Sequence, residues 1–339
     1  MQPVLVTGAT GFVGSHVARV LAERGEAVRA LARVGSRREL LAGLPVEFVA
    51  GDLRDRESLD QACAGVGRIY HVAADYRLWA RDPREIYASN VAGTINLLEA
   101  ARRAGVNRFV YTSTVATVWV PHRDMLPDES TSATIEEMVG HYKRSKLMAE
   151  QEVLQAARNG LPAIIVNPTT PVGPGDAKPT PTGRIILDFL RGRMPAYVDT
   201  GLNLVGVEDV ATGHLLAAER GQVGRRYLLG SRNMTLKEIL DVLAGITGRR
   251  APRLRLPHAV AYAAGWADEW LARMTGREPQ IPLEGVRMSR HKMFVDCSRA
   301  TRELGFAPSP VEAALERAVR WYTDRGYVAR GSVSGWVAA

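Results

Sequence analysis

A tyrosine and a lysine, Tyr142 and Lys146, stand four residues apart in a stretch that predicts a helix. Residues at positions i and i+4 lie on the same helix face, so the phenol and the ammonium can approach each other. A free tyrosine has a pKa of about 10 and is a poor base at neutral pH. A neighbouring positive charge favours the phenolate and lowers that pKa. The pair therefore indicates proton transfer to or from a hydroxyl or carbonyl group, unless it is an ordinary pair on an exposed helix.

A glycine pattern near the start of the chain predicts a phosphate-binding loop. The predicted strand 3–7 runs directly into G-x-x-G-x-x-G at residues 8–14 and then into a helix predicted over 12–24. The first glycine permits a tight turn, the second lets the backbone approach a pyrophosphate, and the third lets the helix pack close to the sheet. Free N–H groups at the helix N-terminus attract phosphate. We expect this loop to bind a dinucleotide through Gly8, Thr10, Gly11, Phe12 and Val13.

The residue at the end of the second strand distinguishes NADP from NAD. NAD-binding proteins usually place Asp or Glu about 20 residues after the glycines, where it binds the ribose 2′-hydroxyl. Arg33 stands there, 19 residues after Gly14, with Arg37 and Arg38 close by. A guanidinium matches a 2′-phosphate, so NADP is favoured over NAD. The alternative is a surface arginine, because the chain has 39 Arg and only 5 Lys.

The alternation of short apolar runs with helical stretches predicts a parallel sheet covered by helices, a Rossmann doubly wound α/β fold. The predicted strands are 3–7, 27–32, 46–50, 68–73, 108–113 and 161–166, and the helices 12–24, 83–104 and 142–157. A Pro- and Gly-rich segment, 168–183, predicts a loop, and helices follow near 208–220, 235–247, 258–274 and 310–325. We expect a dinucleotide-binding domain of residues 1–168 with a return segment at about 204–230. A smaller, mostly helical substrate lobe would hold residues 169–203 and 231–339.

A cluster of hydroxyl groups ends the strand predicted over 108–113, in Thr112, Ser113 and Thr114. The carboxyl ends of strands in such a sheet face the ligand crevice. A hydroxyl group there can hydrogen-bond the reacting oxygen of a substrate and share its proton.

Taken together, these features resemble the extended short-chain dehydrogenase/reductase family over nearly the whole chain. The resemblance also rests on Gly51-Asp52-Leu53, on His71 to Ala74 and on Asn90 to Thr94. It implies that the family's catalytic Ser/Thr falls on Thr114, with Ser113 as a rival, beside Tyr142 and Lys146. It further implies that a set of residues contacts the adenine or the nicotinamide of the cofactor or supports Lys146. These residues are Asp52, Leu53, Ala73, Ala74, Asn90, Thr112, Pro168, Thr169 and Thr170.

Within that family the chain looks most like hopanoid-associated sugar epimerases and the related dihydroflavonol-type reductases. Long strings carry this likeness, at 72–83, 140–146, 167–176, 178–186, 192–203 and 292–294. The likeness implies a sugar-like or hopanoid-linked substrate and a homodimer formed through the helices around 83–104 and 142–158. A net reductase and an epimerase fit the same residues. A non-catalytic dinucleotide-sensing protein is the remote alternative, and the presence of both Tyr142 and Lys146 argues against it.

The substrate side is predicted from loops at the crevice mouth. Tyr76 and Trp79 follow the strand predicted over 68–73, and Thr182 and Asn203 lie in the segments assigned to the substrate lobe. Each of the four is a candidate substrate contact, and loop packing is the alternative for each. His141 lies on a different helix face from Tyr142, which predicts a bystander.

The helix predicted over 258–274 places Tyr262, Trp266, Trp270 and Met274 at intervals of four residues. Such a stripe is typical of a face buried in the core. The alternatives are an apolar wall for a lipid-like substrate and a contact with a membrane surface.

Composition excludes several other classes of protein. The net charge is +8, but the basic residues are scattered and are not interleaved with aromatic residues, so nucleic-acid binding is not expected. The two cysteines, Cys63 and Cys297, form no CxxC motif, which predicts neither a disulfide nor a metal site and fits a cytoplasmic protein. No apolar run approaches the length of a membrane span, although a peripheral membrane contact stays open.

Overall fold

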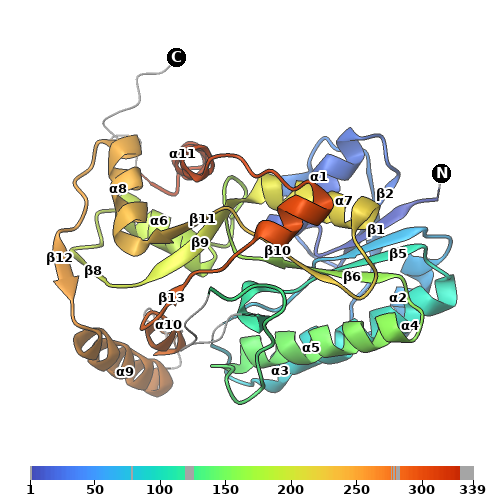
Figure 1. Ribbon diagram of the computed structural model, residues 1–339, viewed down its shortest axis with the longest axis horizontal. Coiled ribbons are helices and arrows are strands. Elements are labelled where there is room, and N and C mark those ends of the chain that lie inside the picture. The colour runs from blue at the N-terminus through green and yellow to red at the C-terminus, as the bar shows by residue number, and fades with distance from the viewer. Residues whose placement is uncertain are drawn as a thin grey trace.

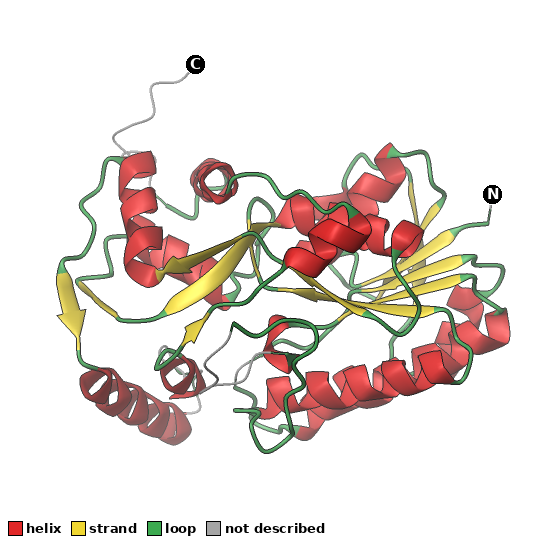
Figure 2. Ribbon diagram, viewed as in Figure 1, coloured by secondary structure: helices red, strands yellow, loops and turns green. Residues whose placement is uncertain are grey.

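The computed structural model describes residues 2–77, 79–118, 126–275, 277, 279 and 283–328. Its centre is a sheet of seven strands, with helices on both faces (Figures 1 and 2). The strands are Val4–Thr7 (β1), Val28–Ala32 (β2), Val46–Ala50 (β3), Arg68–His71 (β4), Arg108–Thr112 (β5), Ala163–Pro168 (β6) and Arg226–Leu229 (β10). The strands lie in the order β3-β2-β1-β4-β5-β6-β10, and each pairs with its neighbours in parallel. The predicted Rossmann fold is confirmed. Its order changes direction between β1 and β4, where ligands bind in such sheets.

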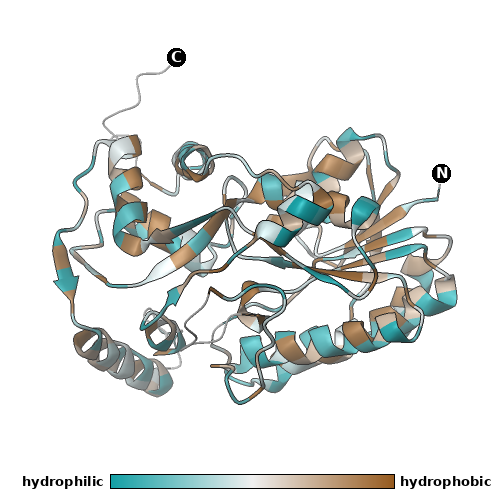
Figure 3. Cartoon of the chain, viewed as in Figure 1, coloured by the Kyte–Doolittle hydropathy of each residue, from teal (hydrophilic) through white to brown (hydrophobic). Residues whose placement is uncertain are grey.

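Helices cover both faces of this sheet because its strands are apolar on both sides. Phe12–Glu23 (α1) and Val207–Arg220 (α7) pack on one face, around residues such as Val17 and Val210. Arg56–Cys63 (α2), Gly93–Ala104 (α4) and His141–Arg158 (α5) pack on the other, around Leu97 and Val153. Hydrophobic stretches follow the central strands (Figure 3). Helix α7 and strand β10 are the part of the chain that returns to the sheet after β6.

The long helical region predicted over 83–104 consists of three joined pieces. They are Arg84–Tyr87 (α3), a π-helical turn at Ala88–Ala92 and α4. Further short turns lie at Glu39–Leu41, Val115–Thr117 and Ala300–Leu304. The π turn carries Asn90, which is buried. Such turns are frequent at functional sites, because they change which side chain faces inward.

The second lobe holds small sheets as well as helices. Thr170–Val172 (β7), Gly201–Gly206 (β9), Arg232–Thr235 (β11) and Lys292–Met293 (β13) form one sheet, and Ala196–Val198 (β8) pairs with Leu254–Leu256 (β12). The helices are Pro181–Leu190 (α6), Leu236–Thr247 (α8), His258–Thr275 (α9), Leu283–Met288 (α10) and Val311–Asp324 (α11). The loop predicted over 168–183 is partly wrong, since β7 and the start of α6 lie in it. Thr180 caps α6 through the Gly183 N–H, and a proline fits the first helical turn.

Helix α9 does not bury the stripe that its sequence predicts. Tyr262, Trp266, Trp270 and Met274 are 40%, 59%, 56% and 70% exposed. The prediction that this stripe is buried in the core was therefore wrong. The periodicity marks one side of the helix, but that side is largely exposed to solvent, with Arg287 of α10 lying over the ring of Tyr262, and α9 lies at the edge of the second lobe (Figure 1). Among the helices of the described residues, none is both long and apolar enough to cross a bilayer.

Candidate active site

The glycine loop has the shape that its sequence predicts. Gly8 has a φ of +69°, and a Cβ there would lie 2.7 Å from the Cα of Ala73, at the end of the neighbouring strand. A Cβ on Gly14 would lie 2.1 Å from the Gly8 carbonyl oxygen. Helix α1 starts after Gly11 with no side-chain cap and no acidic residue in its first turn. Its first N–H groups are therefore available to an anion, and the loop fits a dinucleotide pyrophosphate.

The carboxyl ends of β2 and β3 bring a cation and an anion together. Arg33 follows β2 and is exposed. Asp52 follows β3 and pairs with Arg54 at 2.8 Å. The hydrogen bonds from Arg54 lower the pKa of Asp52 to about 2, and the charge of Arg33 contributes. Leu53 packs against Gly93 of α4, which holds this edge in place. Asp52 is thus already neutralised by Arg54, while the guanidinium of Arg33 faces solvent.

Tyr142 lies in the first turn of α5, a helix that begins directly after Gly140, whose φ is +85°. Burial raises the pKa of Tyr142 to about 12, a hydrogen bond with Thr114 opposes that rise, and the carboxylate of Glu284 adds to it. The lowering of this pKa that the nearby Lys146 was expected to cause is not found in this state, because burial dominates. The phenol is therefore protonated at neutral pH and can donate a proton. Thr114, which follows β5, is the hydrogen-bond partner of the Tyr142 hydroxyl group.

Lys146 is held one turn further along α5, only 2% exposed. Its Nζ donates to Tyr111 Oη and to the Thr112 carbonyl oxygen, both at 2.7 Å. Burial lowers the pKa of Lys146 to about 7, and the nearby Glu150 opposes this change. The structure thus brings Tyr142, Thr114 and Lys146 to one end of β5, and two acceptors on β5 hold the ammonium.

The three hydroxyl groups of residues 112–114 have different partners. Thr112 Oγ1 lies 2.8 Å from Nε2 of His214. Ser113 Oγ donates to Glu150, which also accepts from Thr117 and from Asn167 and pairs with Arg226. Thr114 caps the turn that follows β5 and also contacts Tyr142. Of the two rivals, Ser113 is committed to a buried structural network, and the geometry favours Thr114.

A chain of buried side chains connects the glycine loop with Lys146. His71 Nδ1 lies 2.8 Å from Thr7 Oγ1, and His71 Nε2 lies 2.9 Å from Thr94 Oγ1. Thr94 also contacts the hydroxyl of Tyr111, the acceptor of Lys146. Burial lowers the pKa of His71 to about 3, and the charge of Lys146 adds to this. His71 is therefore neutral, so one ring nitrogen donates and the other accepts.

Asn90 connects the loop after β4 with α5. Its Nδ2 donates to the Asp75 carbonyl oxygen and to Ser145 Oγ, both at 2.9 Å, and its Oδ1 accepts from the Asp75 N–H. The neighbouring Ala73 donates its N–H to Thr7 Oγ1. The half-buried Ala73 and Ala74 thus lie beside the glycine loop, at the switch point of the sheet.

The residues predicted to border the nicotinamide follow β6. Pro168 ends that strand, and Thr169 donates both its N–H and its hydroxyl to the Leu229 carbonyl oxygen of β10. Thr170 starts β7 and is half-buried. These three residues lie at the same edge of the sheet as Thr112 and Thr7, since the strands are parallel.

Comparison with known proteins assigns the family. Residues 4–230 match the NAD dependent epimerase/dehydratase family. The chain belongs to that family. It is 48% identical to "Putative dihydroflavonol 4-reductase" of Synechocystis sp. over 95% of each chain. It is 39% identical to "Sterol demethylase protein B" of Methylococcus capsulatus, over 96% of this chain and 99% of the other. The crystal structure of gox2253 has a TM-score of 0.86 and 47% identity, covering 97% of this chain and 100% of that one.

The family assignment and the fold make this chain a nicotinamide-dependent enzyme of the extended short-chain dehydrogenase/reductase type. The resemblance found in the sequence is confirmed. The glycine loop fits the cofactor that the family name states. The roles of the individual residues at the family's active site stay predictions.

The four residues predicted to touch substrate lie in different surroundings. Tyr76 is 39% exposed, and its hydroxyl donates to the Lys178 carbonyl oxygen, which connects the loop after β4 with the loop before α6. Trp79 is half-buried in the loop after β4. Thr182 is buried within α6. Asn203 is buried in β9, and its side chain is occupied by Asn233 and by the Ser231 N–H. Tyr76 and Trp79 are thus the more accessible candidates.

Several groups that lie beside the candidate site residues were missed in the sequence. The alternation of side chains along a strand could have found Tyr111, because Tyr111 lies one residue before Thr112 and points to the other face of the sheet. Glu150 lies one helical turn beyond Lys146, which is a weak signal. Glu284 had no signal, since α10 brings it to Gly140 from 144 residues further along the chain. Burial raises the pKa of Glu284 to about 7.

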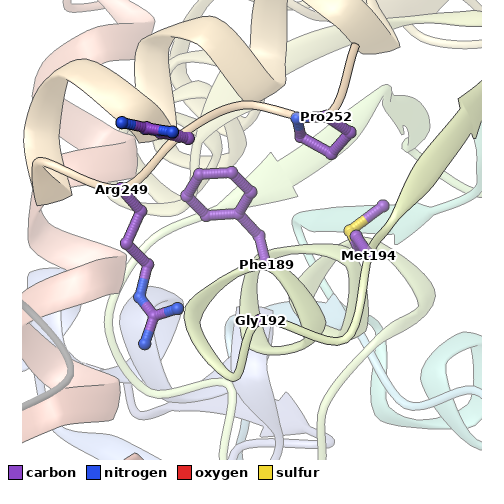
Figure 4. A pocket seen from close by; sticks show the side chains of 6 residues that line it. Phe189, Gly192, Met194, Arg249 and Pro252 are labelled. Carbon is purple, nitrogen blue, oxygen red and sulfur yellow. The ribbon is translucent and has the colours of Figure 1, made fainter. Parts of the chain in front are cut away.

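Other features of the protein lie away from Tyr142, Thr114 and Lys146. His141 Nδ1 lies 3.2 Å from Tyr87 Oη, an exposed contact between α5 and α3. A surface hollow of about 270 Å³ in the second lobe is lined by Phe189, Gly192, Met194, Arg249, Arg250 and Pro252 (Figure 4). None of these six is a predicted site residue. Among the described residues, no three His, Cys, Asp or Glu side chains gather as metal ligands would.

Proposed function

We propose that the enzyme transfers a hydride between NADP(H) and a secondary hydroxyl or carbonyl group of a sugar-like, lipid-linked substrate. The observation that supports this best is the arrangement of Tyr142, Thr114 and Lys146 at the end of β5. It offers one proton donor, one hydroxyl group to hold the substrate oxygen and one buried cation.

The residues would act on the substrate oxygen as follows. Thr114 donates a hydrogen bond to the carbonyl oxygen and orients it toward Tyr142. The nicotinamide ring, when bound, supplies the hydride to the carbonyl carbon. As the C=O double bond becomes a C–O single bond, the Tyr142 O–H bond breaks and its proton moves to the oxygen. Lys146 then stabilises the phenolate by its charge until a proton returns. Oxidation runs through the same groups in reverse.

Arg33 supports NADP over NAD. Arg33 is exposed after β2, on the strand next to β1 and its glycine loop. The charge of Arg33 is felt by Asp52, but that carboxylate is already paired with Arg54. An exposed guanidinium pairs with a 2′-phosphate through charge-assisted hydrogen bonds. Binding of NADPH and NADH, followed by tryptophan fluorescence, tests this part of the proposal.

The substrate class rests on likeness. Two relatives carry names that refer to a dihydroflavonol and to a sterol, which are large, ring-containing molecules. Tyr76 and Trp79 offer aromatic surface near the site for such a molecule, and the proposed hopanoid-linked sugar combines an apolar body with a hydroxylated end.

We further infer a homodimer through α4 and α5, and a cytoplasmic location, which the free cysteines Cys63 and Cys297 support.

Net reduction is tested by loss of NADPH absorbance with a panel of open-chain aldoses, alkyl ketones, a steroid 3-ketone and a dihydroflavonol. Turnover that consumes NADPH supports a reductase. The second candidate, an epimerase, is supported by the family that the chain matches. An epimerase would invert a hydroxyl group with no net change in cofactor, and chromatography of the sugar products distinguishes it. Failure of both reactions across sugar and lipid carbonyls would refute the proposal.

A further inference from the structure

Helix α9 exposes an unusually large apolar surface for a helix of a folded lobe. Of its 18 residues, only Gly265 and Ala272 are buried. These two lie seven residues apart, so they mark one narrow inward face. On the outward side Trp266 and Trp270 are 59% and 56% exposed, and Met274 is 70% exposed. Exposed patches of large apolar side chains commonly mark a binding surface.

Val260 and Leu271 extend this patch, at 52% and 43% exposed. We name the patch the α9 face and define it by the exposed side chains Val260, Tyr262, Trp266, Trp270, Leu271 and Met274. Tryptophan and tyrosine rings suit a boundary between an apolar and an aqueous phase, because each has an apolar body and one polar group.

The acidic residues of α9 turn away from this face. The Asp268 side chain is 14% exposed and pairs with Arg277 at 2.6 Å, and the Glu269 side chain is 18% exposed and lies 3.6 Å from Arg273. The Arg273 side chain itself is 73% exposed. The solvent-facing side of the helix therefore presents aromatic and aliphatic groups together with a cation, while both carboxylates lie low against the lobe.

The surrounding segment is strongly basic. Residues 249–292 contain nine Lys and Arg but only four Asp and Glu, so this short part of the chain carries five of the eight net positive charges. Arg253 and Arg255 are exposed in the strand region that leads into α9, on either side of Leu254, which is 61% exposed. Asp199, which follows β8, pairs with Arg255 at 2.8 Å and with Lys292 at 3.6 Å, so one carboxylate offsets part of this charge. Strand β12 and α9 lie together at the edge of the lobe (Figure 1). A basic rim around an apolar face is complementary to anionic lipid headgroups over acyl chains.

A second copy of the chain matches this surface less well. Pairing two copies through the same face would bring two basic rims together without a carboxylate from the outward side of either helix. Like charges placed opposite each other at an interface oppose association. An anionic bilayer instead satisfies both the apolar face and its rim.

We propose that the α9 face docks the enzyme on the surface of an anionic membrane, with the helix lying in the plane of the headgroups. Helix α10, which packs on α9, also places Glu284 against Gly140 at the start of α5. The docking helix is therefore connected to the active-site helix through one short element. A lipid-linked substrate would then reach the site from the membrane. The docking proposal itself does not depend on the proposed reaction.

The test is flotation of the full chain with phosphatidylcholine vesicles, with and without phosphatidylglycerol. We expect binding to the anionic vesicles that weakens as salt rises, and at least a tenfold loss of affinity for Trp266→Ala/Trp270→Ala. Val223→Ala is the matched control, because Val223 is 47% exposed outside this segment. The control variant should bind as the wild type does.

Both tryptophans are exposed, so the double variant should keep the melting temperature of the wild type. As a second measurement, brominated lipids should quench the tryptophan fluorescence of the wild-type protein. Absence of vesicle binding, or equal binding by the double variant, would overturn the proposal. A wild-type dimer that the double variant converts to a monomer, without vesicle binding, would overturn it in favour of self-association. If the double variant loses vesicle binding but still oxidises NADPH with water-soluble carbonyl compounds, the result would support docking independently of the reaction.

Discussion

Replacing Tyr111 by phenylalanine tests how β5 controls the charge of Lys146. The substitution removes Tyr111 Oη, which accepts from Lys146 Nζ at 2.7 Å, and leaves only the Thr112 carbonyl oxygen as a described acceptor. A hydrogen bond to a charged group is worth about 1.5–3 kcal/mol. One pKa unit corresponds to about 1.4 kcal/mol. Loss of this bond should therefore make the ammonium form of Lys146 harder to keep.

The direction of the effect follows from the burial of Lys146. Burial already lowers its pKa to about 7, so the charged form is present below that pH and is lost as the pH rises through it. In Tyr111→Phe the loss should begin at lower pH, by about one to two pH units. The assay is kcat/KM for NADPH-dependent reduction across the neutral range, which reports the ionisations of the free enzyme.

The control is Tyr87→Phe, which removes a hydroxyl group near the start of α5 that contacts His141 and not Lys146. It should leave the pH profile in place. An unchanged profile in Tyr111→Phe, with the melting temperature also unchanged, would refute the role assigned to Tyr111. A uniform fall in rate at every pH would equally count against it.

Three further predictions concern other parts of the site. Arg33→Ala should weaken NADPH binding about 10- to 100-fold in fluorescence titrations and leave NADH binding unchanged, and equal losses for both cofactors would contradict the 2′-phosphate contact. Glu284→Gln removes a carboxylate that raises the pKa of Tyr142, so Tyr142 should ionise at lower pH in an ultraviolet titration, and an unmoved curve would show that the charge does not reach the phenol. Gly14→Ala should lower the melting temperature by about 2–10 °C, because its Cβ would meet the Gly8 backbone, whereas Gly245→Ala, with open space around it, should slightly stabilise α8, and calorimetry compares the two.

Much of the fold is predictable because its signals are local. The apolar runs of the parallel strands, the glycine loop and the ends of α1 and α5 depend on residues close together in the chain. The start of α6 was harder to find, since proline in 168–183 suggested a loop, yet Pro181 stands where a helix accepts it. Two of the strand pairs of the second lobe, β8 with β12 and β9 with β13, join segments more than fifty residues apart and leave little local pattern.

The candidate site divides in the same way. Tyr142 and Lys146 were found because helical spacing places them on one face. The choice between Ser113 and Thr114 needed the structure, because it depends on Glu150 taking one of the two hydroxyl groups. Glu284 could not be found by spacing, since only the folding of the second lobe brings it to α5. The stripe on α9 has the same periodicity whether it is buried or exposed, so only packing decides between core and surface.

The central claim is that Tyr142 transfers the proton that accompanies hydride transfer. The most direct measurement is the single-turnover rate of NADPH oxidation by Tyr142→Phe, using the carbonyl compound that the wild type reduces best, together with the Kd for NADPH. The account predicts a fall of about 10²- to 10⁴-fold in the rate, with NADPH binding unchanged. A Tyr142→Phe variant that binds NADPH and turns over within a few-fold of the wild type would contradict the account.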